Sequence, residues 1–199
     1  MEFTTQAKIE SDLPLVSCLC VTKNKIEVLQ RAIQCFKSQN YQNKELIIVK
    51  QNEDPIITQY FQDLGDKEIT FINVSDAPQL SLGELRNLSI EKAKGEYMCI
   101  WDDDDWYHEE RISVQIEAVL RNYHPATVLT NELIYDEFNG KLFFSQIRLW
   151  ENSLVFNKSL FTQGIKYPPL PQGEDAHFMK QLMAKSKVFP RPFFCSFGE

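Results

Sequence analysis

The sequence lacks the glycine patterns that mark the common nucleotide-binding loops. It has seven glycines among 199 residues, and none of them forms G-x-G-x-x-G or G-x-x-x-x-G-K-[ST]. A standard dinucleotide fingerprint and a P-loop are therefore both excluded. No G-x-S-x-G pentapeptide occurs either, which argues against the serine-nucleophile elbow found in many hydrolases.

Zinc-type and disulfide patterns are also missing. The five cysteines include no C-x-x-C pair, and the three histidines show no metal-binding spacing on a helix. An odd number of cysteines in a chain of this length favours reduced side chains that fill a hydrophobic core, as in a cytoplasmic protein. We expect His177, two residues after Asp175, to be a solvated helix residue rather than a metal ligand.

Long apolar runs and an excess of positive charge are absent as well. The apolar runs have about the length of strands, well short of the roughly 20 residues that span a bilayer. The first twelve residues are polar and of mixed charge, unlike a secretory signal. With 21 Lys+Arg against 28 Asp+Glu, the net charge is −7, which disfavours a nucleic-acid partner. A nucleotide ligand is still allowed, because a divalent cation can reverse the local charge.

The sequence does contain the pattern of an α/β protein. Hydrophobic residues make up 43% of the chain and charged residues 25%, as in ordinary globular domains. Apolar runs predict strands at 16–21, 45–49, 69–74 and 97–101, and helical stripes predict helices near 26–36, 57–64, 85–93 and 112–123. Strands that are apolar on both faces predict a parallel sheet with helices on both sides.

The last third of the chain has a different pattern. Residues 127–156 predict further strands, and Asn139-Gly140 between two apolar segments predicts a hairpin. A proline-rich loop at 168–171 precedes a helix that opens at Gly173. No linker or repeat separates the two parts, so we expect a single domain, 1–199, in which both parts share one sheet.

The sharpest chemical feature is the acidic run Asp102–Asp105, directly after the fourth predicted strand. The carboxyl ends of parallel strands meet at one edge of the sheet, where ligands bind. Consecutive carboxylates repel each other unless a cation lies among them. Asp102 and Asp104 would point to the same side, as ligands for Mg²⁺ together with substrate phosphates. The alternative is an acidic helix start, and we expect capping of the next helix to account for Asp105.

A second acidic pair, Glu174 and Asp175, lies at the start of the last predicted helix. A carboxylate in this position can act as a general base toward a hydroxyl group. The alternative is helix capping, with Gly173 as the cap residue and two acids in the first turn. Position alone favours capping, because such helix starts are common.

Two further sets of candidate ligand-binding residues come after the third and the first predicted strands. Arg86 lies early in the helix after the third strand, where its guanidinium could bind a phosphate. It could equally pair with Glu84 or Glu91 at the surface. Residues 22–25 follow the first strand, and their amides could read a base edge or only form a turn.

Taken in chain order, these motifs resemble glycosyltransferase family 2. The resemblance covers about residues 14–185 and rests on the segments Val21-Thr22-Lys23-Asn24, Ser38-Gln39-Asn40-Tyr41, Val49-Lys50-Gln51-Asn52-Glu53, Gly83-Glu84-Leu85-Arg86-Asn87, Ala93-Lys94-Gly95-Glu96-Tyr97, Asp102–Asp105 and Gly173-Glu174-Asp175. It implies the GT-A fold, a Rossmann-like α/β architecture with a mostly parallel central sheet flanked by helices and a smaller mixed β/hairpin acceptor part. Residues 14–105 would form the nucleotide-sugar donor half and 106–199 the acceptor half.

The resemblance implies a metal-dependent, inverting transfer of a sugar from a nucleoside diphosphate sugar to an acceptor hydroxyl. Asp104 would hold Mn²⁺ or Mg²⁺ with support from Asp102, and Asp103 would lie near the ribose. The metal would neutralise charge on the leaving diphosphate. Asp175 would take the proton from the acceptor, and Glu174 would orient the acceptor or Asp175.

The remaining donor contacts come from four positions. Arg86 would contact the diphosphate, and Thr22, Asn24 and Gln51 would line the base pocket. In the family, two acids usually stand where this chain has Lys50-Gln51. A Gln amide can both donate and accept, so a UDP-linked donor is expected while the identity of the base stays open.

The acceptor would be a saccharide or a lipid-linked saccharide in cell-surface polysaccharide or glycoconjugate synthesis. The protein would be cytoplasmic, with peripheral association at the inner face of the membrane or with another subunit. Two alternatives stay open at this point. One is a nucleotidyltransferase on a related fold, and the other is a non-catalytic nucleotide-binding subunit.

Overall fold

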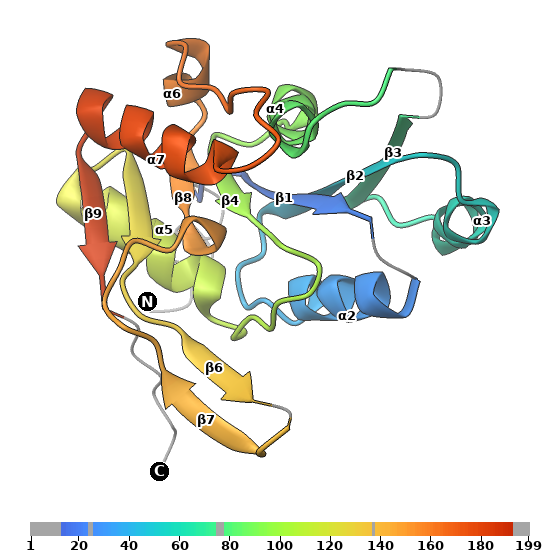
Figure 1. The fold of residues 1–199 in the computed structure, drawn as a ribbon, viewed down its shortest axis with the longest axis horizontal. Coiled ribbons are helices and arrows are strands. Elements are labelled where there is room, and N and C mark those ends of the chain that lie inside the picture. Colours follow the sequence, from blue (N-terminus) through green and yellow to red (C-terminus); the bar gives the residue numbers. More distant parts are fainter. Residues whose placement is uncertain (1–12, 24–25, 75–77, 137, 193–199) are drawn as a thin grey trace, which may run out of the picture.

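The computed structural model describes residues 13–23, 26–74, 78–136 and 138–192. Its centre is a seven-stranded sheet with the order β3-β2-β1-β4-β8-β5-β9 (Figure 1). The strands are β1 Val16–Thr22, β2 Lys44–Gln51, β3 Ile69–Val74, β4 Tyr97–Ile100, β5 Ala126–Leu129, β8 Val155–Asn157 and β9 Val188–Arg191.

The first four strands form the predicted parallel sheet. β1 pairs in parallel with β2 and β4, and β2 pairs in parallel with β3. β8 runs antiparallel to both β4 and β5, while β5 and β9 are parallel. The predicted fold class is confirmed, because a mostly parallel sheet lies between helices. Strand β9 was not predicted.

Helices cover both faces of this sheet. They are α2 Ile26–Lys37, α3 Pro55–Leu64, α4 Leu82–Lys92, α5 Arg111–Asn122, α6 Ser159–Thr162 and α7 Glu174–Lys185, with a 3₁₀ turn, η1, at Glu151–Ser153. The apolar faces of α2, α3 and α5 pack on one side of the sheet, and those of α4, α6 and α7 pack on the other (Figure 1). The two layers bury nearly all of β1, β2 and β4.

Local sequence explains where the helices begin. Asp54 caps α3 by accepting from the backbone N–H of Ile57, and Pro55 occupies the first turn. Ser81 and Glu84 form a reciprocal capping box at the start of α4. Both helices therefore begin two or three residues before their predicted starts.

The predicted hairpin exists but stands apart from the main sheet. β6 Leu133–Asp136 pairs antiparallel with β7 Lys141–Phe144 in a separate two-stranded sheet. Gly140 in its turn has a φ of 62°, a conformation that glycine adopts without strain. The expectation that the two parts of the chain share one sheet is confirmed by β5 and β8, whereas β6 and β7 form a sheet of their own.

The described cysteines are Cys18, Cys20, Cys35 and Cys99, and all four are buried and free. This agrees with their predicted place in the core, whereas Cys195 lies outside the described residues. Among the described residues, no helix has the length and apolar character needed to cross a bilayer.

Candidate active site

The carboxyl ends of β1, β2 and β4 lie at the edge of the sheet where the sequence predicts a ligand site. β1 ends at Thr22, β2 at Gln51 and β4 just before Trp101. The Thr22 hydroxyl donates a hydrogen bond to the Asp103 carboxylate, and both side chains are buried. The acidic segment after β4 is thereby fixed to the end of β1, so residues 81 positions apart in sequence form one edge.

The four aspartates of the acidic segment have different surroundings. Asp102 is partly exposed, with Oδ1 3.6 Å from Nη2 of Arg86. Burial raises the pKa of the Asp102 carboxyl, although the charge of Arg86 acts in the opposite direction. Asp104 is exposed, and its backbone oxygen accepts from Nη2 of Arg31 at 3.1 Å. The Asp102 carboxylate is therefore held against Arg86, whereas Asp104 is exposed to solvent.

Asp105 does not cap a helix. α5 begins only at Arg111, after Glu110. The Asp105 carboxylate instead accepts from Nδ2 of Asn152 at 3.0 Å and from the Tyr107 hydroxyl at 3.3 Å. The capping prediction for Asp105 is therefore wrong, because five intervening residues form turns and a loop before the helix starts.

Arg86 lies at the centre of an acidic cluster. Its Nη1 is 3.4 Å from Oε1 of Glu174 and 3.5 Å from Oε2 of Glu151, and its Nη2 faces Asp102. Burial alone would lower the pKa of Arg86, but the surrounding acids, Glu151 foremost, hold it above its ordinary value. One cation therefore joins the segment after β4, the η1 turn and α7.

The surface pairing considered for Arg86 is not present. Glu84 accepts from the backbone N–H and hydroxyl of Ser81 in the capping box, and Glu91 lies 3.8 Å from Lys166. Both acids are therefore engaged by other partners, and the Arg86 side chain is only 11% exposed. The interpretation in which Arg86 faces the ligand edge agrees with this placement.

Glu151 is a site residue that the sequence analysis missed. It lies on η1, is buried, and accepts a hydrogen bond from the Tyr167 hydroxyl. Burial raises the pKa of the Glu151 carboxyl to about 7, although the nearby Arg86 lowers it. Nothing in the local sequence could have revealed this, because a single acid after a tryptophan forms no motif.

The face of α4 beside Arg86 explains the spacing of Gly83-Glu84-Leu85-Arg86-Asn87. Asn87 donates to the Tyr167 carbonyl at 2.8 Å and accepts from the Tyr167 N–H at 3.0 Å. A Cβ on Gly83 would lie 2.4 Å from the Pro168 carbonyl oxygen, so only glycine permits this approach. Positions i and i+4 of one helix therefore hold the loop that precedes α7.

The first turn of α7 carries the second acidic pair. Gly173, at φ 77°, is the N-cap residue, and Glu174 and Asp175 occupy the first turn as predicted. Glu174 is buried against Arg86, whereas Asp175 is half-buried and accepts from the N–H of Ala176 at 2.7 Å. His177 is exposed, in agreement with its predicted solvated position.

Gln51 is buried with its amide engaged by a neighbouring loop. Its Oε1 accepts from the Leu80 N–H at 3.0 Å and from Nε2 of Gln79 at 3.2 Å, and its Nε2 donates to the Pro78 carbonyl at 3.1 Å. The side chain therefore holds residues 78–80 against the end of β2. Asn24, the other amide expected at the base, lies outside the described residues.

The acidic segment offers the ligand chemistry of a hard divalent cation. Among the described residues, no group of three or more His, Cys, Asp or Glu side chains converges as a metal cage. Mg²⁺ and Mn²⁺ favour carboxylates, and Mg²⁺ is often held by one or two carboxylates together with substrate phosphates and water. The exposed Asp104 and the partly exposed Asp102 fit this second kind of site.

Two solved structures that share this fold are complexes with nucleotide sugars. TarS 1-349 from S. aureus in complex with UDP-GlcNAc matches 93% of this chain and 60% of its own chain, with a TM-score of 0.73 and 13% identity. The mannosyltransferase PcManGT from Pyrobaculum calidifontis, in complex with GDP-Man and Mn²⁺, matches 96% of this chain and 61% of its own, with a TM-score of 0.67 and 14% identity. At these identities, the likeness establishes the fold alone.

Sequence comparison gives the family. The GalNAc(5)-diNAcBac-PP-undecaprenol beta-1,3-glucosyltransferase of Campylobacter jejuni is 24% identical over 184 residues, which are 92% of this chain and 57% of the relative. The chain spans about half the length, or less, of the curated relatives that it matches. The family model described as Glycosyl transferase family 2 matches residues 17–182, and the chain therefore belongs to that family.

Proposed function

We propose that this chain transfers a sugar, with inversion, from a nucleoside diphosphate sugar, most simply UDP-linked, to an acceptor hydroxyl. The observation that carries the proposal is the Arg86 cluster, which brings Asp102 together with the first turn of α7. A metal–diphosphate site at Asp102 and a general base in the first turn of α7 would thereby lie side by side. In this proposal residues 14–105 bind the donor, residues 106–199 bind the acceptor, and the whole is one domain.

The donor would bind at the ends of β1, β2 and β4. Asp104, exposed to solvent, would hold Mn²⁺ or Mg²⁺ with Asp102 in support, and Asp103, fixed by Thr22, would lie near the ribose. When bound, the cation would neutralise negative charge on the diphosphate leaving group. Arg86 would add a fixed positive charge on the same side of the donor. The complex of PcManGT with GDP-Man and Mn²⁺ supports this assignment.

The base pocket would lie between the ends of β1 and β2. Thr22 is fixed there, and Gln51 would act through the 78–80 loop that its amide holds. Asn24 belongs to the same proposed pocket. The TarS structure in complex with UDP-GlcNAc, which shares this fold, supports a uracil nucleotide as a ligand.

Asp175 would be the general base. An inverting transfer is a single displacement, so it requires one base for the acceptor hydroxyl and no covalent nucleophile on the protein. Asp175 is the less buried acid of the α7 first turn, while Glu174 is engaged by Arg86. Glu174 would therefore position the turn and orient Asp175 or the acceptor.

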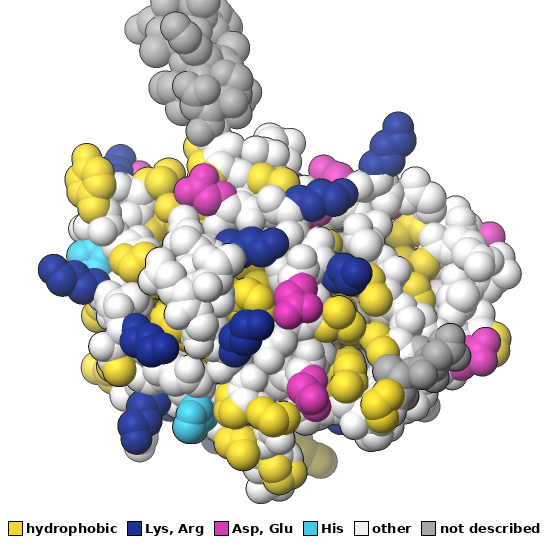
Figure 2. Space-filling model, turned by 90° about the horizontal axis from the view of Figure 1, so that it is seen from above, with side chains coloured by type: hydrophobic (Ala, Val, Ile, Leu, Met, Phe, Trp, Pro, Cys, Tyr) yellow, Lys and Arg dark blue, Asp and Glu magenta, His cyan; other side chains and the backbone are white. Residues whose placement is uncertain are grey.

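The acceptor would be a saccharide, free or lipid-linked, and the reaction would take place at the inner face of the membrane. The C. jejuni relative is named for an undecaprenol-linked substrate, which supports a lipid-linked acceptor. Figure 2 shows Lys and Arg side chains spread over the face that carries α4, α6 and α7. Exposed lysines there include Lys92, Lys166, Lys180 and Lys185, which would favour anionic lipid.

Donor binding and turnover are tested separately. We would measure thermal shifts with UDP, GDP, CDP and ADP, with and without Mn²⁺, and release of nucleoside diphosphate from UDP-glucose, UDP-GlcNAc and GDP-mannose. Saturating nucleotide at about 100 Kd adds about 2.7 kcal/mol, a shift of several degrees for this size. Asp175→Asn should keep the shift and slow release by about 10²–10⁴-fold. His177→Asn, an exposed change on the same helix, is the matched control.

Each outcome separates the alternatives. Full turnover in Asp175→Asn would overturn the base assignment. Nucleotide binding with no release from any donor would favour a non-catalytic subunit. When the same assays are run with nucleoside triphosphates, a strong thermal shift together with release of pyrophosphate would favour a nucleotidyltransferase.

A further inference from the structure

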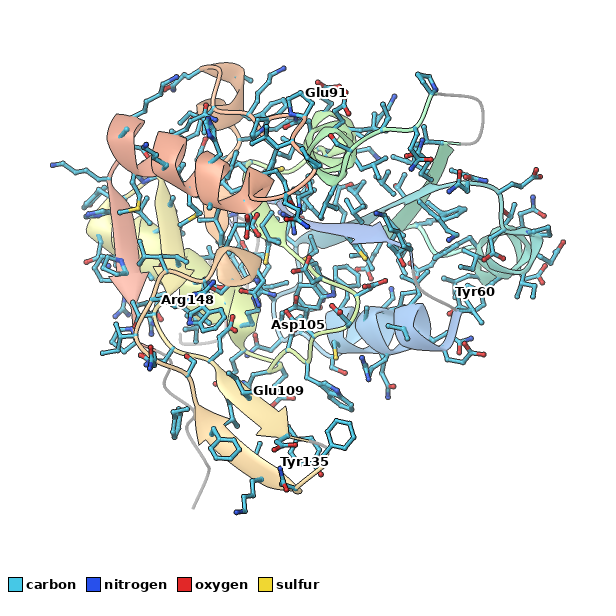
Figure 3. The ribbon with its side chains drawn as sticks, viewed as in Figure 1. Tyr60, Glu91, Asp105, Glu109, Tyr135 and Arg148 are labelled. Carbon is cyan, nitrogen blue, oxygen red and sulfur yellow. The ribbon has the colours of Figure 1, made fainter. Side chains whose placement is uncertain are left out.

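The β6–β7 hairpin projects from the body of the molecule and exposes apolar side chains on both of its faces (Figure 1). Residues directly opposite each other share a face, so Tyr135, which Figure 3 labels, lies with Leu142, and Ile134 lies with Phe143 on the other face. Their side chains are 59%, 59%, 46% and 49% exposed. Monomeric proteins rarely expose large contiguous apolar patches, so such a surface marks contact with another molecule.

The backbone of β7 is open along its outer edge. Among the described strands, the sheet that contains β7 has β6 as its other member. The Ser145 N–H donates to the Glu132 carbonyl, and such bonds recur at every second residue of an antiparallel pair. The backbone groups of Phe143 therefore face β6, whereas those of Leu142 and Phe144 point away from it. An isolated two-stranded hairpin is only marginally stable in water, so a further strand at this edge would stabilise it.

A lipid bilayer does not match this hairpin. Hydrocarbon offers no hydrogen-bond partner to the outward backbone groups of Leu142 and Phe144, and open sheet edges are avoided in that medium. The hairpin also carries two charged residues, Asp136 and Lys141, directly opposite each other. A protein strand can satisfy the outward backbone groups and cover the apolar side chains at the same time.

The β7 edge fits a partner strand better than the β6 edge. Residues 133–135 of β6 line a hollow between the hairpin and α5, whereas Phe143 lies outside that lining. Charge favours the same edge. Pairing of two β6 strands about a two-fold axis at Ile134 would put Asp136 opposite Glu132 of the other copy, and two acids in that position repel. β7 has the sequence Lys-Leu-Phe-Phe, with its one charged residue at the first position.

We propose that β7 pairs antiparallel with β7 of a second copy of this chain, about a two-fold axis at Phe143. Leu142 and Phe144 of each copy then exchange backbone hydrogen bonds with Phe144 and Leu142 of the other. The two Phe143 side chains lie opposite each other, and the two Lys141 side chains lie at opposite ends of the pair. A two-fold contact closes on itself and does not continue as a filament.

This inference goes beyond the proposed function and does not depend on it. The hairpin lies on one side of the seven-stranded sheet, and α4, α6 and α7 cover the other side (Figure 1). A dimer formed through β7 therefore leaves the face that carries α4, α6 and α7 open. The ends of β1, β2 and β4 belong to the seven-stranded sheet and take no part in the contact.

The test measures self-association of the chain with and without charge at the axis. Sedimentation equilibrium between about 1 and 100 µM should show a dimer with a micromolar dissociation constant, because a contact between two short strands is small. Phe143→Glu and Phe143→Lys each put like charges opposite each other, and each should weaken the dimer by about tenfold or more. Ile56→Glu, at an exposed apolar position of α3, is the matched control and should leave the dissociation constant within about twofold.

A mixture of the two Phe143 variants tests the pairing register. The introduced carboxylate and ammonium groups attract each other across the axis, so the mixture should associate about fivefold or more tightly than either variant alone. This recovery also shows that both variants are folded. In NMR spectra of the wild-type protein, exchange of the Leu142 and Phe144 amide protons should slow as the protein concentration rises, because these groups become donors in the dimer.

A wild-type chain that stays monomeric across this concentration range overturns the inference. A dimer that Phe143→Glu leaves intact, or a mixture of the two variants that associates no more tightly than its components, overturns it as well. A monomer that binds phosphatidylcholine vesicles, and loses that binding in Phe143→Glu, would also overturn it and assign the hairpin to a bilayer.

Discussion

Asn87 contacts the backbone of Tyr167 with both atoms of its amide. Its Nδ2 donates to the Tyr167 carbonyl at 2.8 Å, and its Oδ1 accepts from the Tyr167 N–H at 3.0 Å. Tyr167 in turn stacks on Phe178 of α7, with ring centroids 3.9 Å apart, and donates to Glu151. The helix that carries Arg86 thus also fixes the loop that sets the position of α7.

We expect the two hydrogen bonds between the Asn87 amide and the Tyr167 backbone, here called the Asn87 clamp, to contribute strongly to stability. Asn87→Ala removes both hydrogen bonds and leaves two backbone groups of Tyr167 unsatisfied, which should lower the free energy of unfolding by about 1–3 kcal/mol. Gly83→Ala should also destabilise, because its Cβ would meet the Pro168 carbonyl oxygen at 2.4 Å. Urea unfolding measures both, and Lys92→Ala, exposed on the same helix, should change little. Equal stability of Asn87→Ala and Lys92→Ala would contradict the clamp.

Glu151 should make stability depend on pH. Its folded pKa of about 7 lies above the unfolded value, so the folded protein binds this proton more tightly between about pH 4.5 and 7. Its contribution is fully present below the unfolded pKa and is lost as the pH rises through about 7. Glu151→Gln should therefore be more stable than wild type at pH 8 by about 1–3 kcal/mol, with little gain at pH 5.

The Glu151→Gln side chain fits the same surroundings. Its amide oxygen can face Arg86, and its amide nitrogen can donate to the Tyr167 hydroxyl. Urea unfolding curves at pH 5, 6, 7 and 8 give the difference between variant and wild type. A difference that stays constant with pH would show that Glu151 titrates normally.

Asp104 should be required for metal-dependent nucleotide binding. In the wild-type protein, EDTA should remove the thermal shift caused by the preferred nucleoside diphosphate, and Mn²⁺ should restore it. In Asp104→Asn, Mn²⁺ should add nothing, because a neutral amide is a weaker ligand for a hard cation. Asp63→Asn, a surface acid on α3, is the control. An unchanged Mn²⁺ response in Asp104→Asn would place the cation elsewhere.

We expect a substitution of Gln51 to lower the affinity for all four nucleoside diphosphates by similar factors. Gln51→Leu leaves the Leu80 N–H without its acceptor and frees the 78–80 loop, so stability should fall by about 1–3 kcal/mol. Affinity for UDP, GDP, CDP and ADP should fall by similar factors, since the Gln51 amide is already engaged by the loop. Gln34→Leu, exposed on α2, is the control. A switch in nucleotide preference would instead indicate that Gln51 reads the base directly.

Periodicity predicted the first half of the fold well. β1, β2, β3 and β4 are long or strongly apolar, and amphipathic helices follow β1, β2 and β4, so the local sequence pattern agrees with the burial seen in the fold. β9 was missed because Val188–Arg191 is short and contains Pro190, which is tolerated only at such a sheet edge. The hairpin turn was predictable from Asn139-Gly140, but its separation from the main sheet depends on packing that no local signal encodes.

The residues of the candidate site stand out in the sequence where they are neighbours, and not where folding brings single residues together. Asp102–Asp105 and Glu174-Asp175 stand out as runs of acids next to strand or helix ends. Glu151 reaches Arg86 from a 3₁₀ turn 65 positions away, and only the three-dimensional structure reveals the contact. The wrong capping role for Asp105 has a similar cause, since its partner Asn152 lies far along the chain.

The two ends of the β6–β7 hairpin lie next to each other. The Arg148 N–H donates to the Thr130 carbonyl at 3.0 Å, and the Ser145 N–H donates to the Glu132 carbonyl at 2.8 Å, so its two ends are adjacent. Residues 133–144 therefore form a unit that begins and ends at neighbouring positions outside the seven-stranded sheet. Exchange of this hairpin for one of different aromatic content would change one surface of the molecule and leave the edge formed by β1, β2 and β4 as it is.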